Sequence, residues 1–148
     1  MSAVSGFRLA KTRPRLGAAL LMMLSASDAS AGDLLCPGDG TFAVANSGFA
    51  AYTIDGQNNP TLTVVRGCSY TFTVNASGHP FWIKTVQGTG AGNGVASVVN
   101  NGTQVGSLTW TVPGDAPNTL FYNCQFHSPM TGTITVIDNP LLFVDGFE

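Results

Sequence analysis

Short runs of alternating apolar and polar residues, separated by clusters of turn residues, constrain the fold of this chain more than any other feature. Residues 108–112 read Leu-Thr-Trp-Thr-Val, which places large apolar side chains on one face and threonines on the other. Residues 61–65 and 70–74 alternate in the same way around Arg66-Gly67, which predicts a hairpin. No stretch of ten or more residues shows a helical period. We therefore expect an all-β protein.

The number and spacing of these runs favour a Greek-key β-sandwich or barrel of seven or eight strands. The expected strands are residues 41–45, 51–54, 61–65, 70–74, 81–85, 108–112, 120–124 and 133–137. Residues 86–107 are the exception, because they are rich in Gly and Asn. The strand-then-helix context of a phosphate-binding loop is missing there, so we expect a flexible surface loop.

The first 31 residues have the three parts of an export signal. An apolar run over 16–24 is too short to cross a bilayer, so we expect no membrane span after cleavage. We predict a signal at 1–31, one domain at 32–138, a C-terminal tail at 139–148, and a periplasmic or extracellular location. The basic residues of the signal are Arg8, Lys11, Arg13 and Arg15, and its cleavage site is Ala29-Ser30-Ala31.

Removal of the predicted signal leaves an acidic protein. Four of the six Lys and Arg residues, but only one of the eight Asp and Glu residues, lie in 1–31, so the remainder has a formal net charge of −5. So few cations cannot form a basic patch for phosphate backbones, and we expect no nucleic-acid partner. Acidity favours instead a cationic or neutral docking partner.

Three side chains near the end of the chain have the spacing of metal ligands. Cys124, His127 and Met130 stand three residues apart, and His79 is the only other histidine. A thiolate, two imidazoles and a weak thioether are the donors of a blue copper site. Two alternatives remain: a buried strand cysteine followed by His and Met by chance, and structural zinc, for which Met is a poor ligand.

The three cysteines leave one without a partner if two of them pair. If Cys124 binds a metal, Cys36 and Cys68 remain, and an exported protein permits a disulfide between them. Two unpaired thiols are the alternative, because only geometry decides. A disulfide that used Cys124 would destroy the proposed copper site.

Two segments resemble the cupredoxins, the family of small blue copper proteins. Residues 76–83, Ala-Ser-Gly-His-Pro-Phe-Trp-Ile, are similar to the family's first ligand segment, and residues 120–134 are similar to its last two strands with the ligand loop between them. The resemblance implies a Greek-key fold and one copper ion held by His79, Cys124, His127 and Met130. It also implies a monomeric one-electron carrier that meets a redox partner protein.

One residue departs from the family pattern. In many cupredoxins the residue after the first histidine donates its backbone N–H to the cysteine sulfur, but here that residue is Pro80, which has no N–H. We therefore predict a reduction potential at the lower end for the family. Four aromatic residues flank the ligand segments, and we expect them to pack in the core or around the site: Phe81, Trp82, Trp110 and Phe126.

The residue types favour a metal-binding function over an enzymatic one. Two histidines cannot supply the oxygen-reducing cluster of a multicopper oxidase. No Asp or Glu lies near Cys124 in sequence to orient His127 for nucleophilic catalysis. Two functions remain: a soluble electron carrier, and a copper-binding module for delivery, storage or adhesion.

Overall fold

Ten β-strands form the regular structure of the residues that the computed structural model describes, which are Cys36 and residues 40–139. Within this part of the chain there is no helix that could cross a membrane. The predicted signal at 1–31, and the predicted tail apart from Asn139, lie outside the described residues. The strands are β1 (Thr41–Ser47), β2 (Ala51–Ile54), β3 (Gln57–Asn58), β4 (Leu62–Val65), β5 (Ser69–Asn75), β6 (Phe81–Lys84), β7 (Val98–Val99), β8 (Val105–Thr111), β9 (Thr119–Cys124) and β10 (Thr131–Ile137).

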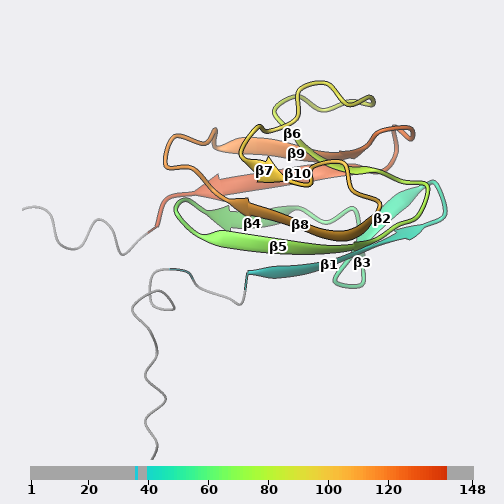
Figure 1. Ribbon diagram of the computed structural model, residues 1–148, viewed down its shortest axis with the longest axis horizontal. Coiled ribbons are helices and arrows are strands. Elements are labelled where there is room, and N and C mark those ends of the chain that lie inside the picture. Colours follow the sequence, from blue (N-terminus) through green and yellow to red (C-terminus); the bar gives the residue numbers. More distant parts are fainter. Residues whose placement is uncertain (1–35, 37–39, 140–148) are drawn as a thin grey trace, which may run out of the picture.

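The strands form two mixed sheets that face each other as a sandwich (Figure 1). The larger sheet has the order β3-β2-β1-β5-β8-β7, and the smaller one has the order β4-β10-β9-β6. β1 pairs with β5, and β4 with β10, in parallel, whereas the other neighbours are antiparallel. Four of the eight neighbouring pairs are not consecutive in sequence, and the chain passes repeatedly between the sheets. The all-β sandwich that the alternation predicts is confirmed.

The strand positions follow the prediction, but one pairing does not. Each expected strand is present with ends shifted by at most three residues, and the structure adds the two-residue strands β3 and β7. The predicted hairpin around Arg66-Gly67 is wrong, because β4 belongs to the smaller sheet and β5 to the larger one. Alternation shows that a strand has one buried face, but it does not identify the strand's neighbour.

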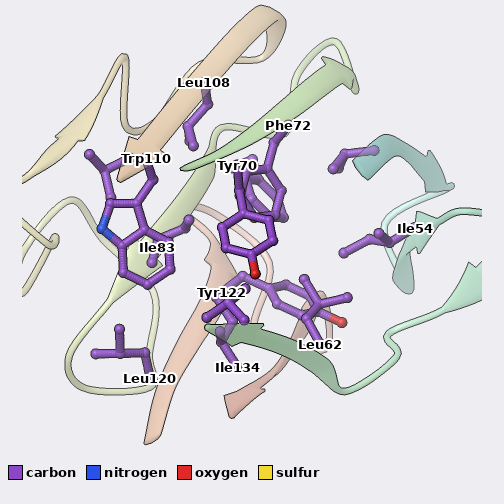
Figure 2. Packing of buried hydrophobic residues seen from close by; sticks show 14 of the residues in the cluster. Ile54, Leu62, Tyr70, Phe72, Ile83, Leu108, Trp110, Leu120, Tyr122 and Ile134 are labelled. Carbon is purple, nitrogen blue, oxygen red and sulfur yellow. The ribbon is translucent and has the colours of Figure 1, made fainter. Parts of the chain in front are cut away.

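The core lies between the two sheets (Figure 2). Phe72, Leu108 and Trp110 from the larger sheet pack toward Ile83 and Tyr122 from the smaller one, and each is at most 1% exposed. Burial of a large apolar side chain stabilises the fold by roughly 1.5–3 kcal/mol. The polar atoms of the two amphipathic residues are also satisfied: Trp110 donates to Ser97 Oγ, and Tyr122 donates to the Pro60 carbonyl.

Cys36 and Cys68 form a disulfide, with 5.5 Å between their Cα atoms. Cys68 directly precedes β5, and its amide and carbonyl bond to Val65 and Val112. The disulfide joins the start of the described chain to the end of the sandwich where β4 ends. Cys124 is the one free cysteine of the three.

The Gly- and Asn-rich segment is more ordered than the flexible surface loop predicted for it. Val95 donates its N–H to the Ile83 carbonyl, and the side chain of Asn101 bonds both backbone groups of Ile83. A Cβ added at Gly102 would overlap the Trp82 ring, so the segment lies directly on that indole. The glycines therefore permit close packing over the outer face of β6.

Candidate metal centre

Three ligand-type side chains meet at one end of the smaller sheet. Cys124 is the last residue of β9, and His127 follows it in the loop of residues 124–130, which we call the ligand loop. β6 pairs with β9 so that Phe81 lies opposite Cys124, which brings the turn that contains His79 beside the sulfur. The donor atoms of His79, Cys124 and His127 all lie within 4.8 Å of one another.

The distances between the donor atoms fit a three-coordinate copper site. His79 Nδ1 lies 3.1 Å from His127 Nδ1, and Cys124 Sγ lies 3.8 Å and 3.4 Å from these two nitrogens. With the bond lengths known for zinc sites, about 2.0 Å to nitrogen and about 2.3 Å to sulfur, a trigonal plane around a metal ion needs roughly 3.5 Å between nitrogens and roughly 3.7 Å between nitrogen and sulfur. One thiolate and two imidazoles at this spacing are consistent with one type 1 copper ion, as in the cupredoxins.

The surroundings of His79 favour the protonation state that binds a metal. Cys124 is fully buried, whereas His79 and His127 are partly exposed at the surface. Burial, and to a smaller extent the neighbouring His127 ring, lower the pKa of His79 below its ordinary value. His79 is therefore neutral at neutral pH, and a neutral imidazole is the metal-binding form.

Backbone hydrogen bonds close the ligand loop. The Cys124 N–H donates to the Met130 carbonyl at 2.9 Å, and the Met130 N–H donates to the His127 carbonyl at 3.2 Å. Met130 is fully buried where the loop returns to β10. Its role as a weak axial ligand stays a prediction.

The cysteine sulfur accepts an amide hydrogen bond, though not from the residue after the first histidine. Phe126 donates its N–H to Cys124 Sγ at 3.5 Å. Pro80, which has no N–H, instead accepts through its carbonyl from the Gln125 N–H at 3.1 Å. The Pro80 segment therefore contacts the ligand loop without contributing a donor to the sulfur.

Sequence reasoning missed a tyrosine that supports the site. Tyr52 of β2 is fully buried, and its hydroxyl donates to the His79 carbonyl at 2.9 Å. Burial raises the pKa of Tyr52 above its ordinary value, and the nearby Cys124 adds to the increase, so this hydroxyl remains a donor. An available signal was the position of Tyr52 in a predicted strand, since a buried tyrosine needs a partner for its hydroxyl.

The aromatic residues near the site divide into two groups. Phe81 and Trp110 are buried, and Trp82 is partly buried, as expected. The expectation for Phe126 was wrong, because its side chain is 60% exposed. Phe49, at 71% exposure, lies with its ring centroid 6.2 Å from that of His127. Loop residues such as Phe126 carry no periodicity from which burial could be predicted.

Comparisons with known proteins give matches among solved structures alone. No protein-family model and no curated protein matches the chain. Rusticyanin from Thiobacillus ferrooxidans aligns at 22% identity over 66% of this chain and 76% of that chain, with a TM-score of 0.47. A purple cupredoxin from Nitrosopumilus maritimus aligns at 20% identity over 67% of this chain and 100% of that chain, with a TM-score of 0.45. The donor atoms themselves carry the case for copper.

Proposed function

We propose that this protein carries single electrons by means of one copper ion held by His79, Cys124 and His127, with Met130 as a weak axial ligand. The observation that carries the proposal is the convergence of one sulfur and two imidazole nitrogens at the spacing of a trigonal plane. When bound there, copper would supply a reversible one-electron change between Cu(II) and Cu(I).

The fixed positions of the ligands support electron transfer rather than copper delivery. Cys124 is the last residue of β9, and its N–H donates to the Met130 carbonyl. The His79 carbonyl accepts from the Tyr52 hydroxyl, and the His79 N–H donates to the Ala76 carbonyl. An electron carrier benefits from ligands that move little between oxidation states. A delivery protein must release its ion, for which such a braced site is less suited.

The surface beside His127 suits a transient protein partner. Phe49, whose ring lies beside that of His127, and Phe126, which precedes His127 in the chain, are both exposed, and exposed aromatic side chains are typical of binding surfaces. The net negative charge predicted for the chain without residues 1–31 would favour a cationic redox partner. We propose that electrons enter and leave through the His127 side in contact with such a partner.

An exported location completes the proposal. The signal predicted at 1–31 supports export, and the Cys36–Cys68 disulfide suits an oxidising compartment such as the periplasm or the extracellular space. The disulfide also keeps both other cysteines away from Cys124, which leaves this thiol for the metal.

Reconstitution with copper tests the function. Cu(II) added to the purified protein should give an intense thiolate-to-copper absorption band, a type 1 paramagnetic resonance spectrum and a reversible one-electron couple. Cys124→Ser should lose the band, whereas Met130→Leu should keep it with a changed potential, because the axial ligand tunes rather than creates the site.

Three results would overturn parts of the proposal. Survival of the band in Cys124→Ser would remove this residue from the ligand set. Bound copper that is colourless or redox-inert would favour the second function, a copper-binding module. Preference for Zn²⁺ over copper in competition would point to a structural metal instead.

A further inference from the structure

A buried lysine lies near the ligand loop without an acidic partner. Lys84, the last residue of β6, is only 1% exposed, and among the described residues it forms no ion pair. Its ammonium group donates instead to the carbonyls of Gly88, Thr89 and Gly90 at 2.6, 3.3 and 2.9 Å. A buried lysine is rare unless its charge has partners, so these carbonyls are what make the position tolerable.

The position of Lys84 follows from the alternation along β6. Phe81 and Ile83 face the core, so Trp82 and Lys84 face outward. The segment after β6 folds back over that outer face and covers both side chains. An outward-facing lysine is thereby enclosed rather than solvated.

The three carbonyls come from consecutive residues of a tight glycine turn, residues 88–90. Gly88 and Gly90 have φ angles of 149° and 84°, which residues with a side chain rarely adopt. Three carbonyl oxygens directed at one point repel one another, and an ammonium group with three donors offsets that repulsion. Lys84 therefore stabilises the glycine turn.

The opposite side of the glycine turn holds the two residues that flank Cys124. Gly90 donates its N–H to the Gln125 carbonyl at 2.8 Å, and Gly88 donates its N–H to Asn123 Oδ1 at 2.8 Å. Asn123 is 1% exposed, so its amide oxygen depends on protein donors. The carbonyls of the turn thus face the lysine while its N–H groups face the ligand strand and loop.

We propose that Lys84 is a positioning residue for the metal centre. Its ammonium group binds the three carbonyls of the glycine turn and so holds the turn in place. The N–H groups of the turn then fix Asn123 and Gln125, and thereby the Cys124 side chain between them. The inference deepens the proposed function, on which it rests for the identity of the metal. The positioning itself is measurable in the metal-free protein.

Arg66 provides a matched control at the other end of β10. Its guanidinium donates to the Ala116 carbonyl at 2.8 Å and pairs with Asp138, so it is also a partly buried cation that braces a loop. Among the described residues, its side-chain hydrogen bonds go to Ala116, Asn118 and Asp138, and none of them reaches the glycine turn or the ligand loop. Loss of Arg66 should lower stability without changing the surroundings of Cys124.

Amide hydrogen exchange of the metal-free protein, followed by NMR, is the test. In Lys84→Ala, the amides of Gly88, Gly90, Cys124 and Gln125 should exchange at least about tenfold faster, the equivalent of one lost hydrogen bond to a charged group. Propylammonium replaces the deleted atoms and should restore slow exchange, whereas propanol, which lacks the charge, should not. Arg66→Ala should leave the amides of Cys124 and Gln125 unchanged.

The copper-loaded protein gives the second readout. The absorption band or the reduction potential should shift in Lys84→Ala and stay unchanged in Arg66→Ala. If Lys84→Ala does not fold, Lys84→Met, which keeps the apolar stem without its donors, serves for both measurements.

Equal exchange at Cys124 and Gln125 in the Lys84 and Arg66 variants would overturn the inference, as would equal rescue by propanol. If the unmodified protein binds no copper, the proposed function fails while the exchange result still decides the role of Lys84.

Discussion

Removal of the Cys36–Cys68 disulfide should destabilise the protein strongly and leave the metal centre intact. The disulfide links residues 32 positions apart. In the chain-entropy model, a closed loop of this length stabilises the folded state by about 3.7 kcal/mol at 25 °C, because the unfolded chain loses conformational freedom. Cys68 precedes β5 beside the end of β4, whereas the metal ligands lie at the other end of β9 and β10.

Urea unfolding of Cys36→Ala/Cys68→Ala against the unmodified protein measures the effect. With a slope near 2 kcal/mol per molar urea, typical of a small domain, the midpoint should fall by about 2 M. Copper titration should give the same absorption band in both proteins. A loss of stability below about 1 kcal/mol would refute the entropic reasoning, and a lost band would show that the site depends on the disulfide.

Three further outcomes are expected. Gly132→Ala should destabilise the protein by about 1–3 kcal/mol in urea unfolding, because the new methyl group would overlap the ring and hydroxyl of Tyr122. The free energy of unfolding should be constant below pH 10 and fall above it, because burial raises the pKa values of Tyr52 and Tyr122 above the ordinary 10.0 and only the unfolded phenols ionise there. The fall should be roughly 1.4 kcal/mol per pH unit for each tyrosine. Circular dichroism against pH checks this, and a flat profile to pH 12 would contradict it. Pro80→Ala supplies an N–H at the residue after His79. If this N–H bonds Cys124 Sγ, voltammetry should show a potential higher by about 40 mV, the equivalent of about 1 kcal/mol for one hydrogen bond. An unchanged or lower potential would count against the role assigned to this residue.

The strands of this fold could be predicted from sequence because alternation is a local property. Residues 108–111 alternate between buried and exposed side chains along β8, as their sequence pattern predicts. Strand partners depend on the whole sandwich, which is why the local pattern predicts one hairpin from the runs before and after Arg66-Gly67 although they lie in different sheets. The parallel pairing of β1 with β5 leaves no local mark in the sequence.

The ligands of the candidate site could also be predicted from sequence, whereas the groups that support them could not. Cys124 and His127 are three residues apart, so one motif contains both, and His79 was found because the chain has no other histidine. The groups that hold these ligands were missed, because their partners are distant: the Tyr52 hydroxyl bonds a carbonyl 27 residues away. Lys84 was missed because a lysine is ordinarily assigned to the surface.

The pairing of β6 with β9 completes the set of three donors. Cys124 and His127 lie within one hairpin, but His79 reaches them only after β6 has docked against β9. A chain with that contact unformed offers two donors rather than three and should hold a soft ion loosely. Tight binding of a metal ion by all three donors would therefore require β6 to be paired with β9.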